Sequence, residues 1–176
     1  MKYLVIAAHP DDAELGMGGT ILRMLEDGLC VGILDLTNGE PTPLGTPEIR
    51  KSETQRATEV LGITWRENLG LLNRKLQPDL AARTALAGVI RQTRPRWLFT
   101  HYWVDAHPDH VAACELTEAA RFWAKLSKCD LQAKPHHPER VFHFWSVHQK
   151  NPPQPSFVID TTKTHERKQQ AINCYK

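Results

Sequence analysis

The chain has 176 residues with 22 Lys plus Arg and 20 Asp plus Glu, so its formal net charge at pH 7 is +2. This balance gives no reason to expect binding to nucleic acid or to an anionic membrane surface. No apolar run reaches the roughly 20 residues that cross a bilayer. The four cysteines form no C-x-x-C pair, and no cleavage site follows the N-terminal apolar stretch, so we expect a cytoplasmic protein.

Strand-like and helix-like segments alternate along the chain. Residues 2–8, KYLVIAA, form a continuous apolar run that is typical of a strand buried on both faces. A helix is expected over 46–62, with Thr46 as its cap, Pro47 at its first position and Gly62 at its end. The other expected helices are 15–27, 78–95, 107–126 and one that begins near 164; the other expected strands are 30–37, 63–69, 96–101, 140–147 and 156–160, the last two joined by the proline-rich residues 150–155.

This alternation predicts an α/β fold with a Rossmann-like, mostly parallel sheet and helices on both faces. We expect one domain over residues 1–176, because no linker, repeat or low-complexity segment divides the chain. In such sheets the ligand lies beyond the carboxyl ends of the strands. The loops after the strands at 2–8, 30–37 and 96–101 are therefore expected to meet.

The tripeptide His-Pro-Asp occurs twice, as HPDD over 9–12 and as HPDH over 107–110, and each copy follows a predicted strand. Histidine and carboxylate side chains on two converging loops suit a catalytic zinc site, which takes three N or O ligands from the protein. His9 and Asp12 can supply two ligands from one loop. With Pro108 at the first helical position, His110 lies in the first turn, where the helix dipole favours the neutral imidazole that a metal needs.

A carboxylate that is not a ligand must accept a proton as water attacks. Asp11, next to Asp12, is the candidate for this role. His107 is the candidate donor to the developing oxyanion or to the leaving group. Asp109 is expected to hold a histidine tautomer from behind.

The remaining polar residues and the glycines have more than one interpretation. Glu14 either suits the dipole of its helix or contacts substrate, and His101 and Asp105 face the same end of the sheet as HPDH. The glycines of GMGG, 16–19, do not match G-x-G-x-x-G, and the acidic residues before them repel a pyrophosphate. We expect these glycines to let the helix pack close to the sheet.

The segments AHPDDAELGMGGT (8–20) and HPDH (107–110) resemble the PIG-L, or LmbE-like, superfamily of zinc-dependent N-acetylglucosaminyl deacetylases. LDLTNGEPTPLGTPEIRKSE (34–53), NLGL (68–71) and PSFVID (155–160) are similar to its bacterial branch, which includes the bacillithiol-pathway deacetylase. The resemblance extends over nearly the whole chain.

The resemblance implies that the zinc ligands are His9, Asp12 and His110. In the same way, it implies that Asp11 is the base and that His107, supported by Asp109, stabilises the oxyanion. It also implies that Arg50 holds substrate, that the Rossmann-like fold binds no nucleotide, and that copies assemble as trimers or hexamers. Two differences from the family pattern stand out. Ala106 replaces an arginine that often precedes HPDH, and relatives usually continue beyond Lys176, so truncation at this end is one expectation for the chain.

The expected activity is hydrolysis of an N-acetyl group from a small N-acetylglucosamine conjugate, such as a glucosaminyl-malate-like molecule, with release of acetate. Zn²⁺ is the expected cofactor, and Fe²⁺ is the alternative in the cell. Three other functions stay open at this point: an amidase of a thiol conjugate, a metal phosphoesterase, which often needs two metals, and an inactive metal-binding interaction protein.

Overall fold

The computed structural model describes residues 1–149, 151 and 153–176. Five parallel strands form one sheet in the order β3-β2-β1-β4-β5, which confirms the expected fold class. The strands are β1 Tyr3–Ala7, β2 Val31–Thr37, β3 Arg66–Leu71, β4 Trp97–His101 and β5 Arg140–Phe144.

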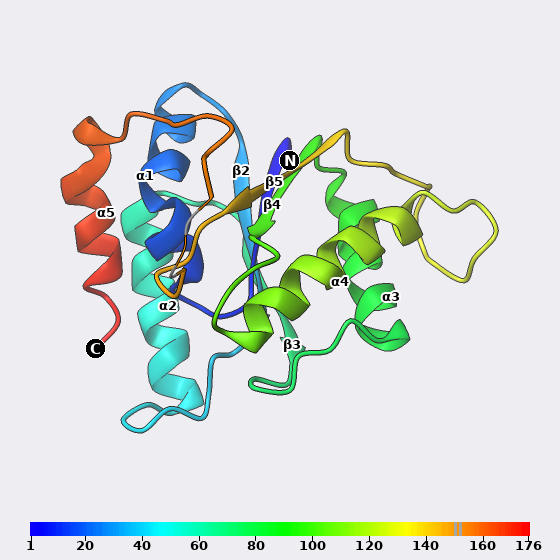
Figure 1. Cartoon of the computed structure of the whole chain (residues 1–176), viewed down its shortest axis with the longest axis horizontal. Helices are drawn as coiled ribbons and strands as arrows, with labels where there is room; N and C mark the ends of the chain where they lie inside the picture. Colours follow the sequence, from blue (N-terminus) through cyan, green and yellow to red (C-terminus); the bar gives the residue numbers. More distant parts are fainter. Residues whose placement is uncertain (150, 152) are drawn as a thin grey trace.

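Helices cover both faces of this sheet (Figure 1). They are α1 Asp12–Glu26, α2 Pro47–Leu61, α3 Leu80–Thr93, α4 Pro108–Ala124 and α5 His165–Ile172, with a short 3₁₀ helix η1 at Thr162–Thr164. In Figure 1, α3 and α4 lie together on one side of the sheet, and α1, α2 and α5 lie on the other. The structure therefore has three layers.

The core is divided by the sheet into two apolar clusters. Leu4 and Ile6 of β1 pack with α3 and α4, whereas Tyr3, Val5 and Ala7 pack with α1. Successive side chains of a strand point to opposite faces, so a central strand that is covered on both sides must be apolar throughout. This explains the uninterrupted run at the start of the chain.

Several expected boundaries are wrong, and one expected strand does not form. Strand β3 spans Arg66–Leu71 rather than 63–69, and β5 ends at Phe144 rather than at residue 147. Helix α1 begins at Asp12 rather than at residue 15, so the second aspartate of HPDD belongs to the first helical turn. Residues 156–160 are not a strand: Phe157 and Val158 are exposed, and the segment pairs with no strand among the described residues. High strand propensity forms a strand only where a neighbouring strand is available. The expected link at 150–155 lies partly outside the described residues.

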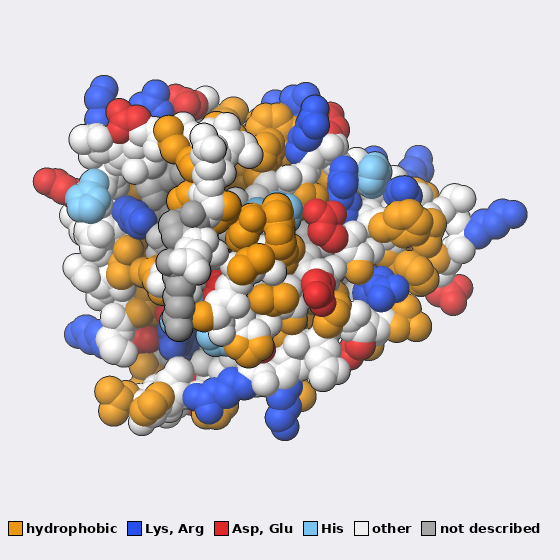
Figure 2. Space-filling model, in the orientation of Figure 1, with side chains coloured by type: hydrophobic (Ala, Val, Ile, Leu, Met, Phe, Trp, Pro, Cys, Tyr) orange, Lys and Arg blue, Asp and Glu red, His pale blue; other side chains and the backbone are white. Residues whose placement is uncertain are grey.

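Charged side chains of both signs are interspersed over the face shown in Figure 2. This distribution agrees with the small formal net charge of the sequence. Within residues 1–149, 151 and 153–176, no helix combines the length and the apolar character needed to cross a membrane.

Candidate metal centre

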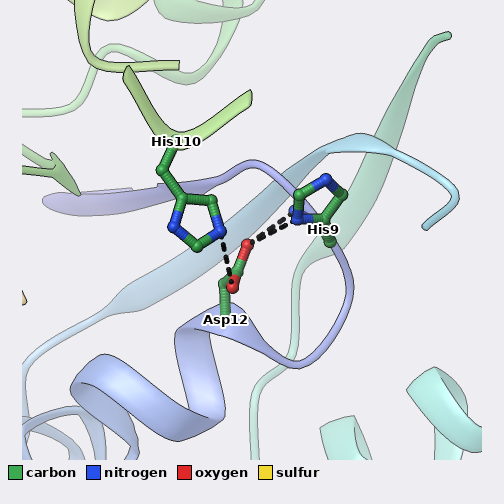
Figure 3. A group of neighbouring side chains, drawn as sticks. All are labelled: His9, Asp12 and His110. Carbon is green, nitrogen blue, oxygen red and sulfur yellow. Dashed lines mark hydrogen bonds and ion pairs between the residues drawn. The ribbon is translucent and has the colours of Figure 1, made fainter. Parts of the chain in front are cut away.

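The two His-Pro-Asp segments meet at the carboxyl ends of β1 and β4, as the sequence predicts. His9 follows β1, Asp12 is the first residue of α1, and His110 lies in the first turn of α4. Figure 3 shows both imidazoles pointing at the Asp12 carboxylate. The distance from His9 Nδ1 to Asp12 Oδ2 is 3.1 Å, and the distance from His110 Nε2 to Asp12 Oδ1 is 3.2 Å.

The second nitrogen of each imidazole faces another carboxylate. His9 Nε2 lies 3.1 Å from Asp109 Oδ2, and His110 Nδ1 lies 3.1 Å from Asp105 Oδ2. In metal sites, a carboxylate behind a histidine ligand fixes the tautomer and the ring orientation. Both histidines are therefore oriented toward Asp12 from behind.

The donor set formed by His9, Asp12 and His110 fits a transition metal. Their ligand atoms all lie within 4.8 Å of one another, and two imidazoles with one carboxylate suit Zn²⁺ or Fe²⁺. Burial alone would raise the pKa of Asp12, but the neighbouring side chains of His101, His110 and His9 outweigh it and hold this pKa well below its usual value. Asp12 is thus a carboxylate at neutral pH, as a ligand must be.

Asp11 occupies the turn between the predicted ligands. Its backbone φ is 110°, in the left-handed region, and its side chain is one-third exposed. Arg50 Nη1 lies 3.3 Å from Asp11 Oδ2. Burial and the charges of Asp12 and Glu14 raise the pKa of Asp11 to about 7, although Arg50 and His9 lower it. A carboxyl group with this pKa can both accept and release a proton near neutral pH.

His107 caps the N-terminus of α4. Its Nδ1 accepts a hydrogen bond from the Asp109 backbone N–H at 3.2 Å, so a neutral ring carries its proton on Nε2. Burial and the neighbouring His110 and His9 lower the pKa of His107. The side chain is therefore a neutral donor through Nε2.

Asp109 lies behind a histidine, as the sequence predicts, but this histidine is His9 and not His107, which the resemblance implied. Its carboxylate lies against His9 Nε2 and accepts a 2.7 Å hydrogen bond from the Arg74 backbone N–H. Only the backbone N–H of Asp109 bonds His107. The first turn of α4 directs the Asp109 side chain back toward the loop after β1, and the sequence contained no information on this orientation.

Arg50 lies on α2 beside the site, where the resemblance placed it. Its guanidinium contacts Asp11, the Pro10 carbonyl oxygen at 3.3 Å and Glu40 Oε1 at 3.4 Å. It also lies 5.6 Å from the centre of the Tyr175 ring. Arg50 thus joins the loop after β1 to the loop after β2.

Glu14 is fully buried, and its carboxylate binds Arg66 of β3 and the Tyr175 hydroxyl at 3.1 Å. The same guanidinium binds Asp35 of β2 at 2.8 Å. This geometry contradicts the interpretation of Glu14 as a surface contact for substrate, because both carboxylate oxygens are engaged in the core. Charge compensation of Arg66 is its role in the fold.

Several residues at the site were not singled out from the sequence. Ser146, which follows β5, donates a hydrogen bond to Asp105 at 2.5 Å. Arg74 has a φ of 62° and reaches Asp109 through its backbone. Ser146 lies just beyond the end of β5, but the sequence predicted this strand to continue to residue 147, so the strand-end rule did not single it out. Nothing in the sequence pattern distinguishes Arg74 or Tyr175.

His101 and Asp105, which the sequence placed at the same end of the sheet, both reach the site. His101 is the last residue of β4, and its ring stacks on His110 with a centroid distance of 4.0 Å. Its Nε2 accepts a hydrogen bond from the Ala8 backbone N–H at 3.1 Å. This bond ties β4 to the end of β1 and supports the plane of the predicted ligand His110.

A pocket of about 480 Å³ borders the site. It lies between the loops after β2 and β3 and is lined by Asn38, Glu40, Pro41 and residues 70–75. Two of these lining residues contact the site directly, since Arg74 bonds Asp109 and Glu40 bonds Arg50. The pocket is large enough for part of a small substrate beside the reacting group.

Comparison with known proteins gives a consistent set of relatives. A diacetylchitobiose deacetylase of Thermococcus kodakarensis is 30% identical, over 99% of this chain and 69% of that protein. A 1D-myo-inositol 2-acetamido-2-deoxy-alpha-D-glucopyranoside deacetylase of Actinosynnema mirum is 28% identical, over 68% of this chain and 54% of that protein. The chain thus spans only part of the length of these curated relatives.

Solved structures extend the comparison. The conserved protein TT1542 from Thermus thermophilus is 40% identical, with a TM-score of 0.93 over 99% of this chain and 78% of that chain.

A relative with a different activity is also similar: 4-oxalmesaconate hydratase of Pseudomonas putida is 26% identical, over 97% of this chain and 71% of that protein. Fold similarity alone therefore does not define the reaction.

The family comparison agrees with the resemblance that the two His-Pro-Asp segments suggest. The sequence profile of the PIG-L family, described as GlcNAc-PI de-N-acetylase, matches residues 4–121. This match covers more than half of the chain and includes both segments. The chain belongs to the PIG-L family.

Proposed function

We propose that this chain is a metal-dependent deacetylase that hydrolyses the acetamide of a small N-acetylglucosamine conjugate to acetate and a free amine. The observation that carries the proposal is the grouping of His9, Asp12 and His110 with Asp11 on one side and His107 on the other. Family membership and the two named deacetylases support the same reaction type.

His9, Asp12 and His110 are proposed as the metal ligands, with Zn²⁺ as the metal and Fe²⁺ as the alternative. When bound, the metal supplies Lewis acidity, which polarises the acetamide carbonyl and lowers the pKa of water. Asp109 and Asp105 hold the two imidazoles in the orientation that this donor set needs.

Asp11 accepts the proton of the attacking water and returns it to the departing amine nitrogen. Its pKa of about 7 suits both transfers near neutral pH. The Nε2–H of His107 donates to the oxygen of the acetamide as negative charge develops on it. The C–N bond breaks as the nitrogen takes the proton, so a neutral amine and acetic acid leave, and the acid releases its proton to solvent as acetate.

The pocket beside the site is proposed to receive the rest of the conjugate. Arg50 contacts Glu40 of its lining, and its guanidinium suits a carboxylate on the substrate, as in a glucosaminyl-malate-like molecule of a bacillithiol-type pathway. A cytoplasmic location and assembly into trimers or hexamers are part of the same proposal. They rest on the resemblance to the bacterial branch of the family.

The proposal is tested by incubating the zinc-loaded protein with N-acetylglucosaminyl-malate, diacetylchitobiose and 4-oxalmesaconate. Release of acetate and free amine from either sugar supports it. Hydration of 4-oxalmesaconate without amine release would replace the deacetylase by a hydratase, the activity of another relative.

Asp11→Asn tests the proposed base. The amide cannot accept the proton of water, so kcat is expected to fall by a factor of about 10² to 10⁴. Zinc content, measured by atomic emission on the purified variant, should equal that of the wild type, because Asp11 is not a proposed ligand. An Asp11→Asn variant with unchanged kcat would remove Asp11 from the mechanism.

A further inference from the structure

Tyr175 connects the buried charges of the core to Arg50. Its hydroxyl donates to Glu14 Oε1 at 3.1 Å, and its ring centre lies 5.6 Å from the Arg50 guanidinium carbon. Arg50 in turn lies 3.3 Å from Asp11, the proposed base. One side chain therefore contacts both the interior of the molecule and a residue at the edge of the site.

The inner end of this connection is firmly held. Glu14, Asp35 and Arg66, here called the core ion-pair cluster, come from α1, β2 and β3. Glu14 is fully buried, and Asp35 is 1% exposed. Buried charges in mutual contact keep a fixed geometry, because separating them leaves an uncompensated charge in the core. The Tyr175 hydroxyl thus has a rigid partner.

The backbone around Tyr175 is held by α2, the helix that carries Arg50. Arg56 donates to the Cys174 carbonyl oxygen at 3.2 Å, and the Lys176 backbone N–H donates to Glu53 at 3.1 Å. These two bonds flank Tyr175 on either side in the sequence. The Tyr175 ring is consequently held against α2, and it faces the guanidinium of Arg50 on that helix.

Arg50, at the other end of this connection, needs a contact that holds its guanidinium in place. Arg50 has two carboxylate neighbours, Asp11 on one side and Glu40 on the other, at 3.3 and 3.4 Å. Holding a long arginine side chain in one conformation costs entropy. A further contact that holds Arg50 in place is therefore expected. A guanidinium within about 6 Å of an aromatic ring gains a cation–π interaction, which favours the observed position, in which Arg50 contacts Asp11 and Glu40 together.

We propose that Tyr175 is a positioning residue of the active site, which holds the Arg50 guanidinium against Asp11 because the core ion-pair cluster fixes its own ring. This assignment rests on the proposed function for Asp11 and Arg50. It gives Glu14 an indirect part in the site, as the anchor of the Tyr175 hydroxyl. Tyr175 itself touches neither substrate nor metal in this scheme.

The test is a double-mutant cycle on the full chain. Tyr175→Met replaces the ring by a smaller, unbranched apolar chain, and it is expected to lower kcat/KM about tenfold. Tyr175→Phe keeps the ring and loses the hydroxyl contacts with Glu14 and Arg66, so its kcat/KM should fall between those of Tyr175→Met and the wild type. In an Arg50→Ala background, Tyr175→Met should cause no further loss, because its effect passes through Arg50.

Additive losses in the cycle would overturn the proposal, since a purely structural role of Tyr175 is independent of Arg50. Thermal unfolding of each variant reports general destabilisation, and Asn173→Ala, an exposed change two residues away, controls for substitution in this segment. Zinc content should stay constant across all variants.

A second readout does not need activity. In the zinc-free wild type, the Arg50 Nε–H resonance, assigned by its loss in Arg50→Lys, should show an upfield ring-current shift that Tyr175→Met abolishes. Absence of this shift in the wild type would overturn the contact itself. If the shift is present while no N-acetylated sugar is hydrolysed, the proposed function fails and the positioning contact stands.

Discussion

At the scale of single residues, the candidate site is built from pairs in which a carboxylate orients a histidine. Asp105 is the clearest case, because it accepts from His110 Nδ1, from the His107 backbone N–H at 2.8 Å and from the Ser146 hydroxyl. Three elements thus converge on one carboxylate: the loop before α4, α4 itself and the turn after β5. The orientation of His110 depends on all three.

Ser146→Ala should weaken zinc binding while leaving the three proposed ligands in place. Without the hydroxyl, Asp105 is free to turn from His110, and loss of such an outer partner typically costs about 10- to 100-fold in metal affinity. Competition with a zinc chelator of known affinity measures the change. Ser127→Ala, an exposed serine, is the matched control, and equal affinities for the two variants would contradict the role of Ser146.

The ionisation of Glu40, in the loop after β2, makes the stability of the fold depend on pH. Burial would raise its pKa, but hydrogen bonds from Thr42 and Arg50 outweigh burial and hold the pKa below the ordinary value of 4.5. A carboxylate with a lowered folded-state pKa stabilises the fold above 4.5, and this stabilisation is lost as pH falls through the folded value. Protonation ends the interaction with Arg50.

Glu40→Gln should therefore lower the free energy of unfolding by about 1–3 kcal/mol at pH 7. The difference from the wild type should shrink as pH falls below 4.5, since the wild type then loses the same charge. Urea unfolding at several pH values measures it, with the exposed Glu48→Gln as control. A difference that stays constant with pH would show that the Glu40 charge is not responsible.

The sequence predicted which residues meet but not how their side chains pair. His9, Asp12 and His110 follow strand ends, and parallel strands bring such positions together whatever the details of packing. The pairing of Asp109 with His9, and of Tyr175 with Arg50, depends on rotamers and on the path of the final residues across α2. These are tertiary facts, and no periodicity or short motif encodes them.

At the scale of elements, α1 shows why glycine follows the HPDD segment. A Cβ on Gly16 would lie 2.5 Å from the Phe144 ring and 3.0 Å from the Trp145 carbonyl oxygen, and one on Gly19 would lie 2.7 Å from Thr161. The expectation that these glycines allow close packing of helix and sheet is confirmed for Gly16, whereas Gly18 and Gly19 allow the close approach of Lys168 and Thr161. The approach of α1 to β5 sets the position of its first turn, which carries Asp12.

Gly16→Ala is accordingly expected to destabilise the fold by about 1–3 kcal/mol through overpacking. Gly88 in the middle of α3 is the matched control, because a Cβ there meets no atom within 4 Å. Gly88→Ala should instead stabilise the helix by roughly 0.5–1 kcal/mol. Urea unfolding of both variants gives the comparison, and a shared sign of the two changes would contradict the packing argument.

Elements with both a pattern and end signals were predicted most closely. Helix α2 has its cap at Thr46, Pro47 at its start and Gly62 at its end, as expected. The start of α1 was misplaced because Asp11, a residue in left-handed conformation, begins the helix without a side-chain cap. The segment at 156–160 has strand propensity but no partner among the described strands, and propensity cannot supply one.

At the scale of the whole molecule, the site lies at the point where the strand order of the sheet reverses, between β1 and β4. From β1 the chain moves outward through β2 and β3, then returns to β4 on the other side of β1. The helices that follow β1 and β4 therefore cover opposite faces of the sheet, and in such folds a ligand binds in the crevice between the two loops at this switch point. His9 and Asp12 stand on one side of the crevice and His110 on the other.

A metal held across this crevice joins the two halves of the sheet, so it should stabilise the whole fold and not only the loops. A ligand that binds the folded state alone adds about 2.7 kcal/mol at a concentration 100 times its Kd. For a chain of this size, each kcal/mol corresponds to roughly 2–4 °C in Tm. Zinc addition to the metal-free protein is expected to raise Tm by several degrees in differential scanning calorimetry.

His110→Ala removes the only proposed ligand on the β4 side, and the zinc-dependent rise in Tm should disappear with it. His165→Ala, at an exposed position of α5, should keep the full rise, because it removes a histidine outside the site. An undiminished rise in His110→Ala would mean that zinc stabilises the chain from the β1 side alone. The crevice would then not be closed by the metal, and the third ligand would have to be sought elsewhere.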